Sequence, residues 1–271
     1  TNWFDIFTAT NLGIMGSYAT AVLAFYGCSR LLRHRIEWAV TFAILFAFGN
    51  PLLAVVNAGS INTGGGNFTA YGQGDASDVT GIKVAGGTIS TGAGTLSLDG
   101  KGYGSGSTNM GIHVSGATLS TTSGDLSLVG TGGGNGISGV SNRGIRIDSG
   151  SHLATGGGAI TLTGIGGFDG DGVQLVGAST LASTSGTITV SGTTGSGTGA
   201  GTDIGFWMSD AGTSVATAAD INLHGVSLAT ANSSNRGLRI AAGAVVDTRA
   251  GAGRIDIAGT GGFDGDGFQL V

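Results

Sequence analysis

Apolar residues recur along most of this chain in a short alternating pattern that follows a glycine. A glycine, an apolar residue, a variable polar residue and a second apolar residue return at intervals of 28 to 33 residues. The glycines of this phrase are Gly81, Gly111, Gly144, Gly172, Gly205, Gly237 and Gly267. Self-similarity at such a period predicts a repeat architecture, in which each unit buries its apolar face by stacking on the next.

Two further apolar features occur in each repeat, and their spacing predicts strands rather than helices. A single apolar residue follows the phrase, as at Ile89, and an alternating pair comes next, as at Leu96 and Leu98. Alternation with a period of two is typical of a strand with one buried face. Three such strands, joined by turns of Gly, Ser, Thr and Asn, bring the chain round once per repeat of about 31 residues.

We therefore predict an all-β fold, a single-stranded, parallel, right-handed β-helix over residues 59–271 with three short strands per coil. Ile61 with Phe68 and Ala70 fits an incomplete first coil. Glycine runs such as 132–134 and 156–158 are expected in turns that require positive φ. The sequence reaches its last residue after the first strand of a new coil, so we expect the repeats to continue beyond it.

A longer repeat is superimposed on the coils. Residues 141–147, Ser-Asn-Arg-Gly-Ile-Arg-Ile, return with one substitution as residues 234–240, 93 residues later. Residues 166–172, Gly-Gly-Phe-Asp-Gly-Asp-Gly, return unchanged as residues 261–267, 95 residues later. Three coils therefore form one duplicated block.

Residues 1–58 lack the repeat pattern and are predicted to form a hydrophobic, α-helical leader. The basic segment 30–35 precedes an apolar run that ends in Val56-Asn57-Ala58, which is typical of a secretory signal peptide cleaved after Ala58. A second apolar stretch, 12–28, leaves open a pair of retained membrane helices with the basic segment in their cytoplasmic turn. A soluble pair of buried helices is a third alternative. The first two interpretations send the repeats out of the cytoplasm, with membrane contact through the leader only.

The composition argues against some classes of function but does not identify one. The chain of 271 residues contains 57 glycines, 1 proline and 1 cysteine, and its formal net charge is −5. After residue 58 it has eight Lys and Arg, fourteen Asp and no Glu, a mildly acidic balance that argues against nucleic acid as a partner. Cys28 precedes the repeats, so they contain neither a disulfide nor a cysteine metal site. No nucleophile and base recur at a fixed spacing, and we predict that these repeats are not an enzyme.

The glycine-rich coils resemble a known family of exported proteins. Residues 81–98, Gly-Ile-Lys-Val-Ala-Gly-Gly-Thr-Ile-Ser-Thr-Gly-Ala-Gly-Thr-Leu-Ser-Leu, come after a long leader, as in haemagglutinin-type exoproteins and autotransporter passengers of Gram-negative bacteria. The sequence departs from this family in lacking the Asn-Pro-Asn-Gly type motifs of two-partner secretion.

The resemblance implies a secreted or outer-membrane location, contact with a secretion machinery, and a stalk-like role in an adhesin. Glycans of host or environmental surfaces are the implied partners. Two functions of other classes stay open, namely a polysaccharide-active β-helix lyase or hydrolase and a ligand-free protein of a surface layer or matrix.

One set of candidate binding residues comes from the polar position of the repeated phrase. The outward residues of the first strand in each coil are predicted to form one row: Lys83, His113, Arg146, Gln174, Trp207, Arg239 and Gln269. With coils about 4.8 Å apart, such a row suits an extended glycan or another polyanion, with Trp207 stacking on a sugar ring and arginine contacting acidic groups. The alternative is a solvated face whose polar residues keep the sheet soluble.

A second set of candidates lies in the duplicated Gly-Phe-Asp-Gly-Asp-Gly turns. Their carboxylates belong to Asp169, Asp171, Asp264 and Asp266. Clustered carboxylates and turn carbonyls suit Ca²⁺, whereas the alternative is ordinary turn chemistry, in which Asp bonds its own backbone. The Ca²⁺-binding nonapeptide pattern is not matched, because Asp169 stands where glycine is required. Apart from this candidate Ca²⁺ site, no cofactor is predicted.

Overall fold

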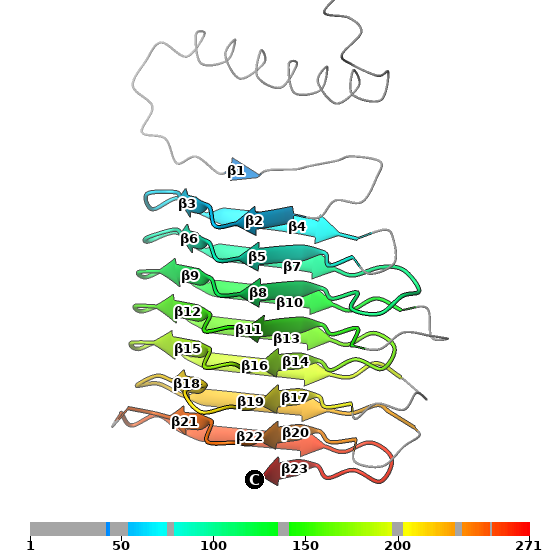
Figure 1. Cartoon of the computed structure of the whole chain (residues 1–271). Helices are drawn as coiled ribbons and strands as arrows, with labels where there is room; N and C mark the ends of the chain where they lie inside the picture. Colours follow the sequence, from blue (N-terminus) through cyan, green and yellow to red (C-terminus); the bar gives the residue numbers. More distant parts are fainter. Residues whose placement is uncertain are drawn as a thin grey trace, which may run out of the picture. The chain divides into compact units, whose positions relative to one another are not determined.

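The repeats form a stack of coils with three faces. A computed structural model describes residues 42–43, 54–74, 79–134, 141–196, 203–230, 235–249 and 251–271. The described residues form strands and turns, with no helix among them. Their strands make three parallel sheets of 8, 8 and 7 strands, in which equivalent strands lie one above another (Figure 1). The prediction of an all-β parallel β-helix is confirmed.

Each coil contributes one strand to sheet B, then one to sheet C, then one to sheet A. Sheet B contains β2 (Ala54–Asn57), β5 (Ile82–Ala85), β8 (Ile112–Ser115), β11 (Ile145–Asp148), β14 (Val173–Leu175), β17 (Phe206–Met208), β20 (Leu238–Ile240) and β23 (Phe268–Leu270). Sheet C contains β3 (Ser60–Asn62), β6 (Thr88–Ser90), β9 (Thr118–Thr121), β12 (His152–Thr155), β15 (Thr180–Ser183), β18 (Ser214–Ala216) and β21 (Val245–Asp247). Sheet A contains β1 (Phe42–Ala43), β4 (Phe68–Gln73), β7 (Leu96–Lys101), β10 (Leu126–Thr131), β13 (Ile160–Ile165), β16 (Ile188–Thr193), β19 (Ile221–Val226) and β22 (Ile255–Thr260).

The leader predicted for residues 1–58 falls mostly outside the described residues. Where it is described, at residues 42–43 and 54–57, the chain forms strands, so the prediction of a helical leader is wrong for these residues. Within that segment, β1 pairs with β4 and β2 pairs with β5. The ladders of sheets A and B therefore include residues upstream of position 59. Among the described residues, no helix has the length and apolar character needed to cross a membrane.

The core is one continuous column of aliphatic side chains. Alternation puts every second residue of a strand inside, so that Ile112, Val114, Leu126 and Leu128 are completely buried. Their equivalents in neighbouring coils belong to the same cluster. The predicted inward positions are confirmed for the inner coils. Strands β22 and β23 are the last in sheets A and B. The corresponding residues there, Ile255, Phe268 and Leu270, are exposed.

Two rows of glycine allow the coils to turn from sheet A into sheet B. One row is the glycine of the repeated phrase, and the other is the fifth residue of each six-residue strand of sheet A, as at Gly164. A Cβ atom on Gly164 would lie 2.2 Å from the backbone oxygen of Gly172, and one on Gly172 would lie 2.2 Å from the amide nitrogen of Thr193. Both glycines are required because two backbones approach too closely for any side chain.

The expectation that the glycine runs 132–134 and 156–158 need positive φ is wrong for most of their members. Only Gly134 has a positive φ, of 99°. A Cβ atom on Gly158 would lie 2.0 Å from the oxygen of Gly124 in the preceding coil. Space between coils, rather than backbone conformation, therefore requires glycine at this corner.

Buried hydroxyl groups close the corner between sheets C and A. Thr91 donates to the oxygen of Gly94 at 2.6 Å, and Thr217 donates to the oxygen of Gly186 in the preceding coil at 2.7 Å. Both threonines are completely buried. Their hydroxyl groups satisfy corner carbonyls that the sheet ladders leave unpaired, which removes the cost of burying those carbonyls.

The close approach at the glycine corner can be tested with two alanine substitutions. We expect Gly164→Ala to destabilise the stack by about 1 to 3 kcal/mol, because the new methyl group forces two backbones apart. Gly157→Ala is the matched control, since the nearest atom to its Cβ is 3.8 Å away and its φ is not positive. Urea denaturation followed by circular dichroism measures both variants. Equal midpoints for the two would contradict the steric role of Gly164.

Candidate functional site

The polar residues of the repeated phrase lie in one row on the outer face of sheet B. Strand register pairs each of them with its equivalent in the next coil: Lys83, His113, Arg146, Gln174, Trp207, Arg239 and Gln269. Because their neighbours along each strand point into the core, these side chains point away from it. The predicted juxtaposition is confirmed, and we call this set the sheet B row.

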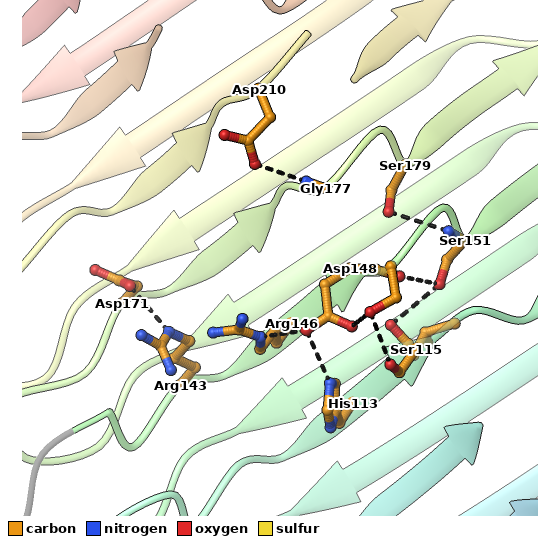
Figure 2. A network of polar contacts seen from close by, with 12 residues as sticks. His113, Ser115, Arg143, Arg146, Asp148, Ser151, Asp171, Gly177, Ser179 and Asp210 are labelled. Atoms are coloured by element: carbon orange, nitrogen blue, oxygen red, sulfur yellow. Dashed lines mark hydrogen bonds and ion pairs between the residues drawn. The ribbon is translucent and has the colours of Figure 1, made fainter. Parts of the chain in front are cut away.

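Asp148 organises the N-terminal half of the sheet B row. It lies two residues after Arg146 on β11, and therefore on the same side of the strand. Arg146 Nε donates to Asp148 Oδ2 at 2.6 Å, and His113 Nε2 lies 3.2 Å from the same oxygen (Figure 2). Ser149 Oγ donates to Asp148 Oδ1 at 3.1 Å. The carboxylate thus joins two neighbouring positions of the row.

The environment of Asp148 favours its ionised form. Burial alone would raise its pKa, but hydrogen bonds from Arg146 and Ser115 and the contact with His113 outweigh burial and hold the pKa well below its usual range. Asp148 therefore stays negative at neutral pH, and it neutralises the Arg146 guanidinium 2.6 Å away.

His113 is a neutral imidazole at pH 7. Burial lowers its pKa from the ordinary value, and the charges of Arg146 and Lys83 lower it further, although Asp148 acts in the opposite direction. Since a carboxylate can only accept, Nε2 carries the hydrogen of the His113–Asp148 contact. The other ring nitrogen, Nδ1, is then an acceptor that suits a hydroxyl donor.

Buried serines beside this half of the row fix the corner between sheets B and C. Ser151 Oγ donates to the oxygen of Asp148 at 2.6 Å, and the amide of Ser151 donates to Ser179 Oγ at 3.1 Å (Figure 2). In the following coil, the amide of Gly177 donates to Asp210 Oδ2 at 2.8 Å. The first contact closes the turn after β11, and the other two link successive coils, so together they position the backbone from which Asp148 projects.

The C-terminal half of the sheet B row contains an aromatic ring and several unsatisfied polar atoms. Arg239 Cζ lies 5.9 Å from the centre of the Trp207 ring, within range of a cation–π contact. Four consecutive positions carry buried polar atoms that lack a hydrogen-bonding partner among the described residues: Gln174 Oε1, Trp207 Nε1, Arg239 Nε and Gln269 Oε1. Two of these atoms accept and two donate. No equivalent set occurs in the N-terminal half of the row as described.

A second polar ladder, missed by the sequence analysis, runs along the corner between sheets A and B. The amide of Val79 donates to Asn109 Oδ1 and the amide of Asn109 donates to Asn142 Oδ1, both at 3.0 Å. Further along, the amide of Asp203 donates to Asn235 Oδ1 at 3.2 Å. Each of these ladder residues stands two positions before the glycine of the repeated phrase, and that spacing is the signal that would have revealed them.

The duplicated motifs of the sequence contact each other across adjacent coils. Asn142 Nδ2 donates to the oxygen of Phe168 at 2.9 Å, and Arg143 Nε donates to Asp171 Oδ2 at 3.1 Å. The second copies repeat both contacts, with Asn235 and the oxygen of Phe263 at 3.4 Å and Arg236 and Asp266 at 3.7 Å. We call each pair of contacts a coil clamp.

The four carboxylates considered for Ca²⁺ differ in burial and in hydrogen-bonding partners. Asp171 is buried and engaged by Arg143 and by the amide of Ile204, at 3.0 Å. Asp169 is buried, whereas Asp264 and Asp266 are exposed, and both Asp169 and Asp264 have positive φ. Within the described ranges, no group of three or more His, Cys, Asp or Glu side chains is arranged to hold a metal ion. Turn chemistry and ion pairing account for the geometry at Asp171.

Asp203 occupies an asparagine position of the corner ladder. Burial, together with the neighbouring carboxylates of Asp171 and Asp169, raises the pKa of Asp203 to about 7. Burial also raises the pKa of Asp171, against the opposing effects of Arg143 and the amide of Ile204. When protonated, Asp203 has a donor and an acceptor, as asparagine does, so the ladder takes up a proton near neutral pH.

Comparison of the chain with protein-family models, with curated protein sequences and with solved structures finds no match.

The contribution of Asp203 to the stability of the stack should fall as the pH rises from about 4 to about 7. In this window the unfolded Asp203 ionises while the folded one, with a pKa of about 7, keeps its proton. The contribution is fully present below pH 4, is lost by the time the pH passes 7, and is on the order of a few kcal/mol at about 1.4 kcal/mol per pKa unit.

Asp203→Asn should flatten this pH dependence and raise the midpoint of thermal unfolding by several degrees at pH 8. Asp256→Asn removes a carboxylate from the outer face of sheet A and should keep the wild-type profile. Thermal unfolding at half-unit steps from pH 4 to 8 measures both variants. A profile for Asp203→Asn that parallels the wild type would contradict the assignment.

Proposed function

We propose that the protein is an exported β-helical scaffold that binds carbohydrate along the outer face of sheet B. The observation that carries the proposal is the run of unsatisfied polar atoms at Gln174, Trp207, Arg239 and Gln269. A buried polar atom without a partner costs about 1 to 3 kcal/mol, so a ligand toward which these side chains turn outward gains affinity from each atom that it satisfies.

The arrangement of these atoms favours hydroxyl groups as partners. A hydroxyl group can donate to the Gln174 acceptor and accept from the Trp207 donor on the next strand, and the same holds for Arg239 and Gln269. A polyol such as a sugar presents several hydroxyl groups at once. The Trp207 ring between these positions offers the apolar surface on which the CH face of a sugar ring stacks.

Export of the scaffold is supported by the character of the N-terminal sequence. The basic segment 30–35 and the apolar residues on either side of it fit an export signal, which would place the repeats outside the cytoplasm. Because β1 and β2 pair within the stack, we expect this signal to lie before residue 42. The resemblance to haemagglutinin-type exoproteins points in the same direction. In this proposal the stacked coils act as a rigid stalk and sheet B as its adhesive face.

A glycan array followed by calorimetry on the full chain tests the binding face. We expect Trp207→Ala to weaken binding to the best array ligand by about tenfold or more, because it removes both stacking and a donor. Trp207→Phe keeps the stacking surface and loses only Nε1, so its affinity should lie between those of wild type and Trp207→Ala. Asn222→Ala is the matched control, since β19 belongs to the same coil but to sheet A.

Thermal unfolding of each variant confirms that the fold is intact, which is expected because Trp207 points away from the core. Wild-type affinity in Trp207→Ala would place carbohydrate elsewhere. An array without any bound glycan would leave the stack as a ligand-free structural protein.

A further inference from the structure

Basic side chains are concentrated on sheet B although the protein as a whole is acidic. Of the eight Lys and Arg residues after position 58, five lie in the sheet B row or two positions before a strand of sheet B: Lys83, Arg143, Arg146, Arg236 and Arg239. Sheets A and C with their turns carry the other three. With a net charge of −5 for the chain, this face is where an anionic ligand meets the least repulsion.

Three of these five cations are neutralised within the protein. Arg143 pairs with Asp171, Arg146 with Asp148 and Arg236 with Asp266. Lys83 and Arg239 form no ion pair with any of the described residues. The face therefore presents two uncompensated positive charges, and both belong to the sheet B row.

The two uncompensated charges lie at a distance that a polymer spans. Lys83 and Arg239 are five steps apart along the stack, through His113, Arg146, Gln174 and Trp207. Parallel strands are about 4.8 Å apart, so the charges are separated by about 24 Å. One strand spacing is close to the length of one sugar residue in an extended chain. Between the charges, neutral His113 and Gln174 present hydrogen-bonding atoms.

We propose that the carbohydrate is a linear acidic polysaccharide that lies along the stacking direction, with carboxylate or sulfate groups at Arg239 and at Lys83 and hydroxyl groups between them. This inference rests on the proposed function and adds the charge, the orientation and the minimum length of the ligand. Sheet B strands of only three or four residues leave little surface across the strands, whereas the row continues over seven strands.

Oligosaccharides of two lengths and two charges test the inference on the full chain. The probes are tetramers and octamers of galacturonate, the same oligomers as methyl esters, and heparin-derived tetramers and octamers, which separate carboxylate from sulfate as the preferred group. We expect an acidic octamer to bind more tightly than its tetramer, because only the octamer reaches Lys83 from Trp207. We expect the methyl ester of the octamer to bind more weakly than the acid, and added salt to reduce that difference.

Lys83→Ala gives the sharpest comparison. Removing this charge should weaken binding of the preferred acidic octamer by about threefold to fivefold and leave the tetramer within twofold of wild type. Lys101→Ala is the matched control, since Lys101 belongs to the same coil, carries the same charge and lies on sheet A. It should leave both affinities unchanged.

The outcomes separate this inference from the proposed function. Equal binding of acid and methyl ester, or an octamer affinity unaffected by Lys83→Ala, would overturn the acidic, axial ligand while leaving carbohydrate binding at Trp207 intact. Failure of both acidic octamers to bind while neutral glycans bind would do the same. Failure of every glycan to bind would overturn the proposed function as well.

Discussion

The stack depends on the contact of two backbones at the corner where sheet A turns into sheet B. At that corner, backbone atoms lie where a Cβ atom would be on each glycine of the two rows. Neither row therefore tolerates a side chain. This constraint fixes where each strand of sheet A ends and where the next strand of sheet B begins. Because the strands pair residue for residue with the next coil, the alternation of inward and outward residues is then fixed for the whole stack.

The three corners of each coil use different residues, but all three satisfy backbone groups that the sheets leave unpaired. Glycine and threonine line one corner, buried serines another, and an asparagine ladder the third. Each corner pairs the backbone groups that the sheets leave over, which permits a chain so rich in glycine to form an ordered core. Outward positions take no part in the core or the corners. Sheet B can therefore carry charged and aromatic residues there without loss of packing.

The sequence alone predicted the sheets and the sheet B row, because both depend on periods that can be counted. Ile112 and Val114 must be buried together once they alternate with His113, and equivalents in the next coil must lie beside them. Other features depend on contacts that no period reveals. Asp148 lies outside the repeated pattern of the row, and its role depends on a carboxylate meeting a histidine one coil away. The reason for glycine at 132 and 158 was likewise mistaken, because local sequence does not show the distance to the neighbouring coil.

The coil clamps also limit how such a protein can lengthen. Coils with similar strands can in principle stack in the wrong order, since aliphatic side chains do not distinguish one neighbour from another. A clamp joins one motif to a different motif in the following coil, and therefore identifies its proper neighbour. A gene duplication that copied only one of the two coils would leave an arginine or an aspartate without its partner inside the stack. A copied segment that carries both halves keeps the contact, and the duplicated block of this chain includes both motifs.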